Sequence, residues 1–253
     1  MERINDILGY KNRKIYQDDN FFSFSLDSVI LANYSTIRKS DKNILDLCSG
    51  NGVVPLIMSL RTDKKIIGVE IQEDLVKLAN KSIKYNKLDK QISMICSDIK
   101  EFITKDRYDS YDLITCNPPY FNNYDRVNLS YEKKIARHEI LINLEEVISI
   151  SSKLLKNGGN LSLVHRPERL VEIISLFNNY NIGISRIKFI YDRIDKPAVS
   201  ILVEGRKNRK CSLKIDKPLI IKNSDGSYTD EYNKLIVEVV KWYKKVMKKT
   251  VYI

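Results

Sequence analysis

Short apolar runs rich in β-branched residues alternate along most of the chain with segments whose apolar residues recur every three or four positions. Such alternation predicts a parallel β-sheet with helices on both faces. The expected helices are residues 53–60, 73–85, 99–103, 144–155 and 167–178. The expected strands are residues 44–48, 65–71, 92–96, 111–116, 160–165, 184–191 and 198–204.

The last two expected strands are joined by a short turn at residues 192–197, which leaves no room for a helical crossover. They should therefore form an antiparallel hairpin at one edge of the sheet. The fold class is α/β, with a seven-stranded, mostly parallel sheet. We expect a central domain at residues 43–205, an N-terminal extension at 1–42 packed on it, and a basic extension at 206–253 ending in a helix from about residue 234 to 248.

The charge balance points to a polyanionic partner, because 43 Lys and Arg residues against 32 Asp and Glu residues give a net charge of +11. Solvated lysines in a chain biased toward Lys, Ile and Asn are the alternative explanation. The densest cluster is Arg206, Lys207, Arg209 and Lys210, which suits contact with backbone phosphates.

Several classes of protein are disfavoured by what the sequence lacks. The apolar stretches are shorter than the ~20 residues needed to span a bilayer, and the first residues form no signal peptide. The four cysteines contain no C-x-x-C pair, so we expect reduced thiols, most of them buried beside strands, and no metal site. These features predict a cytoplasmic protein without a membrane partner. The sequence does not define the oligomeric state, although a monomer is slightly favoured.

A glycine turn follows the first expected strand and suits a cofactor. Gly50 and Gly52 allow the backbone to turn sharply and approach a ligand closely, and Glu70, 20 positions after Gly50, suits the hydroxyls of a ribose. Pro55 stands where a pyrophosphate-binding turn needs its third glycine, so the dinucleotide fingerprint fails. A nucleoside cofactor without phosphate fits better.

The tetrapeptide Asn117-Pro118-Pro119-Tyr120 follows another apolar strand, where ligands bind in α/β sheets. An exocyclic amino group on a flat ring needs two hydrogen-bond acceptors and a face for stacking. We expect the Asn117 side-chain oxygen and the Pro118 carbonyl to accept its two hydrogens, and Tyr120 to stack on the ring. Phe121 would extend the stacking wall. Ordinary core packing is the alternative for both aromatic residues.

These segments resemble the Rossmann-like class I methyltransferases that use S-adenosylmethionine. The resemblance implies that Asp46, Gly50 and Gly52 hold the methionine end, with Asn117 beside it. It also implies that Glu70 binds the ribose, while Ile71 and Asp98 contact the adenine. This family often has glycine where Cys48 stands. Asp46 capping the turn and Asp98 capping a helix remain alternatives.

The N-P-P-Y motif resembles that of amino-methyltransferases. Further segments at residues 24–32, 136–139, 203–207 and 226–232 are similar to the bacterial enzymes that methylate N6 of the adenine 3′ of the anticodon in valine tRNA. The resemblance implies a tRNA substrate and contacts to RNA from Arg137 and His138. A helix start at Arg137 and a capping or packing role for His138 are the alternatives.

Four other functions share some of these features. Glutamine methyltransferases carry the same motif but usually have a larger helical domain before the glycine turn than residues 1–42 could form. Methyltransferases acting on adenine in DNA should carry a sizeable base-reading domain, and another amine, such as one in rRNA, would also fit. A non-catalytic RNA-binding protein is the alternative from another class, and the intact Asn117 and glycine turn argue against it.

Overall fold

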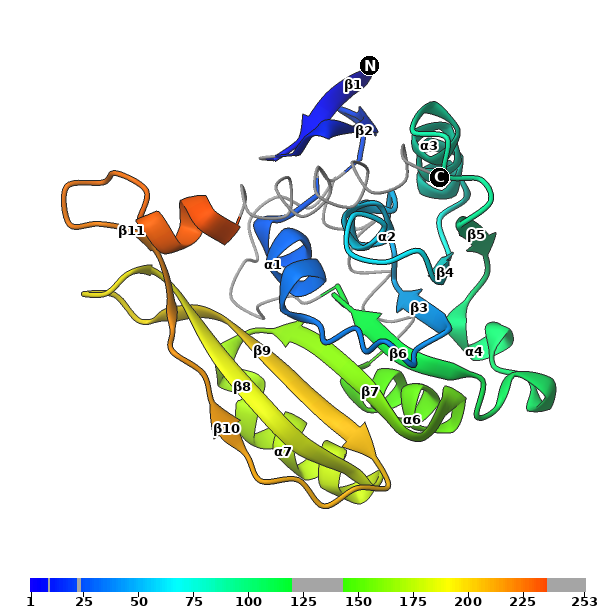
Figure 1. The fold of residues 1–253 in the computed structure, drawn as a ribbon, viewed down its shortest axis with the longest axis vertical. Coiled ribbons are helices and arrows are strands. Elements are labelled where there is room, and N and C mark those ends of the chain that lie inside the picture. The colour runs from blue at the N-terminus through cyan, green and yellow to red at the C-terminus, as the bar shows by residue number, and fades with distance from the viewer. Residues whose placement is uncertain (9, 22–23, 120–142, 236–253) are drawn as a thin grey trace, which may run out of the picture.

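The computed structural model describes residues 1–8, 10–21, 24–119 and 143–235. Within these residues, one mixed sheet of nine strands forms the centre of the molecule (Figure 1). Its strands, in chain order, are β3 (Asn43–Leu47), β4 (Lys65–Glu70), β5 (Ile92–Cys96), β6 (Tyr111–Cys116), β7 (Leu155–His165), β8 (Ile182–Arg193), β9 (Ala198–Lys207), β10 (Lys214–Ile215) and β11 (Leu219–Lys222).

The seven expected strands are confirmed as the body of this sheet. Strands β5, β4, β3, β6 and β7 lie side by side and parallel, β9 runs antiparallel to β7, and β8 runs antiparallel to β9. The hairpin of β8 and β9 therefore lies toward one edge of the sheet, as expected, and the short strands β10 and β11 add to the outer side of β8. β8 is 12 residues long, and its outer side gives these two short strands backbone partners. Strands of two and four residues are too short to be predicted from their own sequence pattern.

Helices cover both faces of the sheet and create two separate apolar cores. One core contains side chains of α1, α2 and β11, and the other contains side chains of α4, α6 and α7. All five expected helices are present, and the segment from residue 167 begins with a 3₁₀ turn, η2 (Pro167–Arg169). The described helices are α1 (Leu26–Tyr34), α2 (Val53–Met58), α3 (Glu73–Tyr85), α4 (Ile99–Phe102), the 3₁₀ turn η1 (Lys105–Arg107), α6 (Leu144–Leu154) and α7 (Leu170–Asn179).

A separate antiparallel hairpin precedes the sheet and was not expected from the sequence. It consists of β1 (Glu2–Ile7) and β2 (Tyr10–Asp18). The backbone of β2 is bonded to α3, because the amide N–H of Tyr16 donates to Ser82 Oγ at 2.9 Å and that of Lys14 donates to Asn86 Oδ1 at 3.0 Å. Long-range bonds to a helix, rather than a strong strand pattern, therefore position this hairpin.

The structure also bears on the expected C-terminal helix and on the expected burial of the cysteines. Residues 230–235 are helical, and most of the helix expected at 234–248 lies outside the described residues. All four cysteines are free; Cys116 is buried, but Cys96 is exposed, so the expectation of a buried thiol is wrong there. In the part of the chain that the structure describes, no helix combines the length and apolar character needed to cross a membrane.

Candidate active site

The expected cofactor turn and the N-P-P-Y motif meet where the strand order reverses. The chain leaves β3 toward β4 and β5 on one side, and returns to β6 on the other side of β3 (Figure 1). Leu47 at the end of β3 pairs with Cys116 at the end of β6, so the two following loops start side by side. Such switch points at the carboxyl ends of strands form the ligand crevice of α/β sheets.

The loop after β3 makes the tight turn that its glycines predict. Gly50 and Gly52 have φ angles of +56° and +80°, in the left-handed region that glycine occupies freely. A Cβ built on Gly50 would have no atom within 4 Å, so the backbone there faces open space. Cys48 also lies in this region, with φ +54°, which explains why glycine suits its position in related turns.

Asp46 is buried beneath this turn, with 1% of its surface exposed. Its Oδ2 accepts a hydrogen bond from Ser49 Oγ at 2.6 Å, and its Oδ1 accepts one from Thr115 Oγ1, also at 2.6 Å. Burial raises the pKa of Asp46 to about 7, partly opposed by these two bonds and reinforced by the charge of Glu70. A cation bound nearby would favour the ionised form. The carboxylate thus holds the Ser49 side chain at the start of the turn, and capping of the turn stays an alternative.

Glu70 ends β4 and lies beside the glycine turn, as the 20-residue spacing predicts. Its Oε2 accepts the backbone N–H of Gly50 at 2.9 Å, and its Oε1 accepts that of Gln72 at 3.0 Å. Oε1 also accepts a longer bond from Gln72 Nε2 at 3.4 Å. These bonds fix the carboxylate and leave Oε2 a further lone pair for a ribose hydroxyl. The neighbouring Ile71 is 38% exposed and offers an apolar surface to a flat base.

Asp98 follows β5 and is the N-cap of α4. Its Oδ1 accepts the backbone N–H of Lys100 at 2.8 Å. The capping alternative is therefore realised, and contact with a cofactor amino group stays a prediction. Because Glu70 pairs with Cys96 at the ends of β4 and β5, Asp98 follows at the same edge of the sheet.

Asn117 follows β6 and is held by two serines of the N-terminal segment. Its Nδ2 donates to Ser28 Oγ at 2.8 Å and to Ser25 Oγ at 3.2 Å. Its Oδ1 is buried and has no hydrogen-bond partner among the described residues. A buried acceptor without a partner is costly, so this oxygen suits a ligand that brings an N–H donor.

Four other expected site residues lie outside the described residues: Tyr120, Phe121, Arg137 and His138. Their roles stay predictions. Pro118 is buried directly after Asn117.

The basic segment, residues 206–210, lies near the other end of the parallel strands from the candidate site. Arg206 pairs with Asn160, which lies opposite Leu113 near the start of β6, whereas the candidate site lies at the carboxyl ends of the parallel strands. Lys207 donates to Asp109 and to the Leu155 carbonyl, each at 2.8 Å. Part of this charge is therefore used within the fold, and any phosphate contact from Arg209 or Lys210 would be far from the reacting base.

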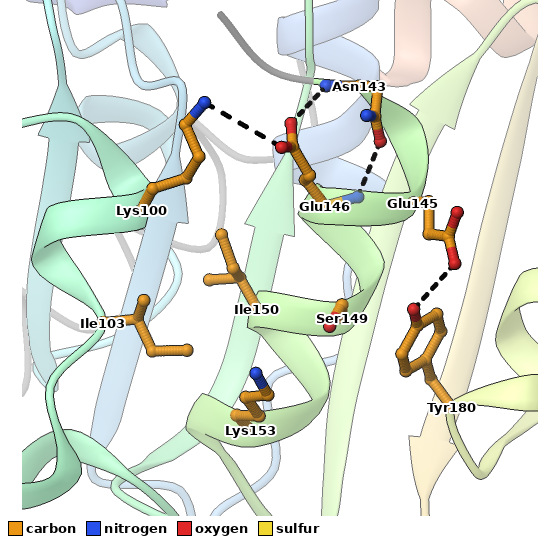
Figure 2. Close-up of a pocket in the computed structure, with 9 residues that line it drawn as sticks. All are labelled: Lys100, Ile103, Asn143, Glu145, Glu146, Ser149, Ile150, Lys153 and Tyr180. Atoms are coloured by element: carbon orange, nitrogen blue, oxygen red, sulfur yellow. Dashed lines mark hydrogen bonds and ion pairs between the residues drawn. The ribbon is translucent and has the colours of Figure 1, made fainter.

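A groove between α4 and α6 is distinct from this crevice. Figure 2 shows Lys100 and Ile103 facing α6, where Glu146 completes a capping box with Asn143 and pairs with Lys100 at 3.9 Å. None of the expected cofactor residues lines this groove.

Sequence reasoning missed the hydroxyl groups that orient the site. Ser49 and Thr115 hold Asp46, and Ser25 and Ser28 hold Asn117. Ser49 and Thr115 adjoin recognised motifs and could have been found by checking which neighbours satisfy a buried carboxylate. Ser25 and Ser28 lie in a segment noted only for its resemblance.

The residues present fit the expected nucleoside cofactor. The open backbone at Gly50, the buried carboxylate of Asp46, the fixed carboxylate of Glu70 and the exposed Ile71 lie along one edge, beside Asn117. Together they offer groups for a cationic amine, a ribose hydroxyl and an apolar base, and no array of backbone donors for a pyrophosphate is needed.

A family model described as a methyltransferase domain matches residues 38–195, and the chain belongs to this family. The names of curated relatives are more specific than the description of the family model. A tRNA1(Val) (adenine(37)-N6)-methyltransferase of Flavobacterium psychrophilum is 28% identical over 230 residues, which cover 89% of this chain and 95% of the relative. A protein of the same name from Shewanella woodyi is 26% identical over 219 residues, or 84% and 89% of the two chains.

Solved structures show the same fold at low identity. A predicted O-methyltransferase from Agrobacterium tumefaciens superimposes with a TM-score of 0.65 at 23% identity, covering 83% of this chain and 95% of that one. TYW2 of P. horikoshii, solved in complex with MeSAdo, has a TM-score of 0.59 at 15% identity, covering 82% and 72%. The Rossmann-like class I methyltransferase fold expected from the sequence is confirmed.

Proposed function

We propose that this chain transfers a methyl group from S-adenosylmethionine to N6 of adenine 37 in valine tRNA. The observation that carries the proposal is the buried acceptor Oδ1 of Asn117, located at the switch point beside the glycine turn. The names of the curated relatives, which match over most of their length, support the choice of substrate. Action on tRNA in turn favours the cytoplasm.

The cofactor half of the site binds and orients the methyl donor. Asp46 and the turn at Gly50 and Gly52 hold the methionine end, Glu70 holds the ribose, and Ile71 with Asp98 contacts the adenine. Bound S-adenosylmethionine supplies an electrophilic methyl group on a sulfonium centre. The ionised form of Asp46 attracts the ammonium group of the methionine end, so cofactor binding should lower its raised pKa.

The acceptor half positions a weak nucleophile, because the lone pair of an adenine amino nitrogen is delocalised into the ring. Asn117 Oδ1 and the Pro118 carbonyl accept the two amino hydrogens, which draws the nitrogen toward tetrahedral geometry and aims its lone pair at the methyl group. As the bond between nitrogen and the methyl carbon forms, the bond from that carbon to sulfur would break and leave a neutral thioether. The nitrogen then loses its proton to solvent, so no strong base is required. Positioning therefore accounts for most of the acceleration.

The testing experiment is methyl transfer from labelled S-adenosylmethionine to bulk tRNA lacking the modification, with nucleoside analysis of the product. N6-methyladenosine in valine tRNA is the expected result. Label in DNA, rRNA or a glutamine-bearing protein would keep the reaction and overturn the substrate. Label in no substrate, with cofactor binding also absent by calorimetry, would favour a non-catalytic RNA-binding protein.

Asn117→Ala separates catalysis from cofactor binding. We expect the Kd for S-adenosylmethionine to change little and kcat to fall by roughly two to three orders of magnitude, the size of effect seen when one transition-state hydrogen bond is removed. Calorimetry and single-turnover methylation measure the two quantities. A large loss of cofactor affinity with an unchanged single-turnover rate would contradict the assigned role.

A further inference from the structure

The amide of Asn117 is held in one of its two orientations by the first turn of α1. Both Nδ2 hydrogens are used, because Ser28 Oγ accepts at 2.8 Å and Ser25 Oγ accepts at 3.2 Å. The amide oxygen is thereby turned away from the serines, where it is buried without a described partner.

This orientation matters for an amine substrate. A primary amide rotated by half a turn would present its N–H donors to the donors of the amino group and could not bind them. In the observed orientation the oxygen is available as the acceptor. In the observed orientation the serine pair holds the amide nitrogen, which leaves the oxygen as the acceptor that the proposed reaction needs.

The serines lie on an element that is itself fixed. Ser25 is the N-cap of α1, since its Oγ also accepts the backbone N–H of Ser28 at 3.4 Å. Asp27 of the same turn accepts a hydrogen bond from Ser200 Oγ of β9 at 2.7 Å, and Val29 is fully buried. Groups held on rigid elements position a site more accurately than groups on loops.

We infer that Ser25 and Ser28 are positioning residues that act through Asn117, presenting its side-chain oxygen to the amino group that is methylated. The inference rests on the proposed function for the identity of that amine. The serines do not touch the reacting atoms. Their effect should consequently appear in turnover rather than in cofactor binding.

Kinetic measurements test this coupling. Ser28→Ala should lower kcat about tenfold, the effect expected from one lost hydrogen bond, and leave the Kd for S-adenosylmethionine unchanged. Ser25→Thr keeps a hydroxyl and a good N-cap, so it should retain turnover that Ser25→Ala loses. Ser35→Ala is the matched control, because Ser35 bonds the Leu31 carbonyl at the other end of α1 and does not contact Asn117. Equal kcat losses in Ser35→Ala and Ser28→Ala would overturn the inference.

A double-mutant cycle sharpens the test. If Ser28 acts through Asn117, then adding Ser28→Ala to Asn117→Ala should cause no further loss of the single-turnover rate. A further tenfold loss in the double variant would mean that Ser28 acts independently, and the inference would fail.

A spectroscopic measurement distinguishes failure of this inference from failure of the proposed function. In protein labelled with ¹⁵N-asparagine, the side-chain NH₂ signals of Asn117, identified by their loss in Asn117→Ala, should exchange slowly with water. Ser28→Ala should shift them and accelerate exchange, and Ser35→Ala should not. This readout needs neither cofactor nor RNA. Unchanged signals in Ser28→Ala would overturn the positioning role even if the protein methylates tRNA.

Discussion

Replacing Asp46 with asparagine should change how the stability of the ligand-free protein depends on pH. Asp46 is buried, and burial raises its pKa from 3.8 to about 7. Between these two values the folded protein holds a proton that the unfolded chain has released. The stability that this proton contributes is fully present below pH 4 and is lost as pH rises to about 7.

The magnitude follows from the size of the shift. About three pKa units at about 1.4 kcal/mol each correspond to roughly 4 kcal/mol. Asparagine keeps the shape of the side chain, and the hydroxyls of Ser49 and Thr115 can accept as well as donate, so the variant should fold. The free energy of unfolding of the wild type minus that of Asp46→Asn should therefore fall by up to roughly 4 kcal/mol from pH 4 to pH 8.

Urea denaturation of both proteins at five pH values measures this difference. The comparison is needed because other groups titrate in the same range, and His165 contributes with the opposite sign. A difference that stays constant across the range, or increases with pH, would refute the argument that Asp46 is protonated in the folded, ligand-free protein at acidic pH.

Three further changes have expected outcomes. Gly68→Ala would place a Cβ 2.5 Å from Met94 Sδ and 2.6 Å from Ser49 Oγ, so it should cost about 1–3 kcal/mol in urea denaturation and weaken cofactor binding by calorimetry. Burial lowers the pKa of His165 from 6.5 to about 4, so the wild type should lose roughly 3 kcal/mol more than His165→Asn between pH 7 and pH 4, the unfolded histidine being the one that takes up the proton. Alanine at Arg209 and Lys210 should weaken tRNA binding and reduce its salt dependence, whereas an unchanged salt slope would mean that these side chains are only solvated.

The central strands β3 and β6 could be predicted because they are buried on both faces and are therefore continuous apolar runs. The expected bounds of α3 match the observed helix, Glu73–Tyr85, since acidic residues begin it and its apolar positions repeat regularly. The hairpin of β1 and β2 has no comparable pattern: five of the six residues of β1 are exposed. Its position depends on bonds to α3 that join residues 66 to 72 positions apart.

The cofactor half and the acceptor half of the site also differ in how far the sequence alone predicts them. Asp46 and the glycine turn are formed by one strand–turn–helix unit, so their arrangement is encoded locally and was visible in the sequence. Asn117 is oriented by Ser28, which lies 89 positions earlier in the chain, and a hydroxyl pair has no pattern of its own. The cofactor half needs β3, β4, β5 and the loops that follow them, whereas the acceptor half also needs α1 docked on the sheet. A change that loosens α1, such as loss of the Asp27–Ser200 bond, should therefore reduce turnover before it reduces cofactor affinity.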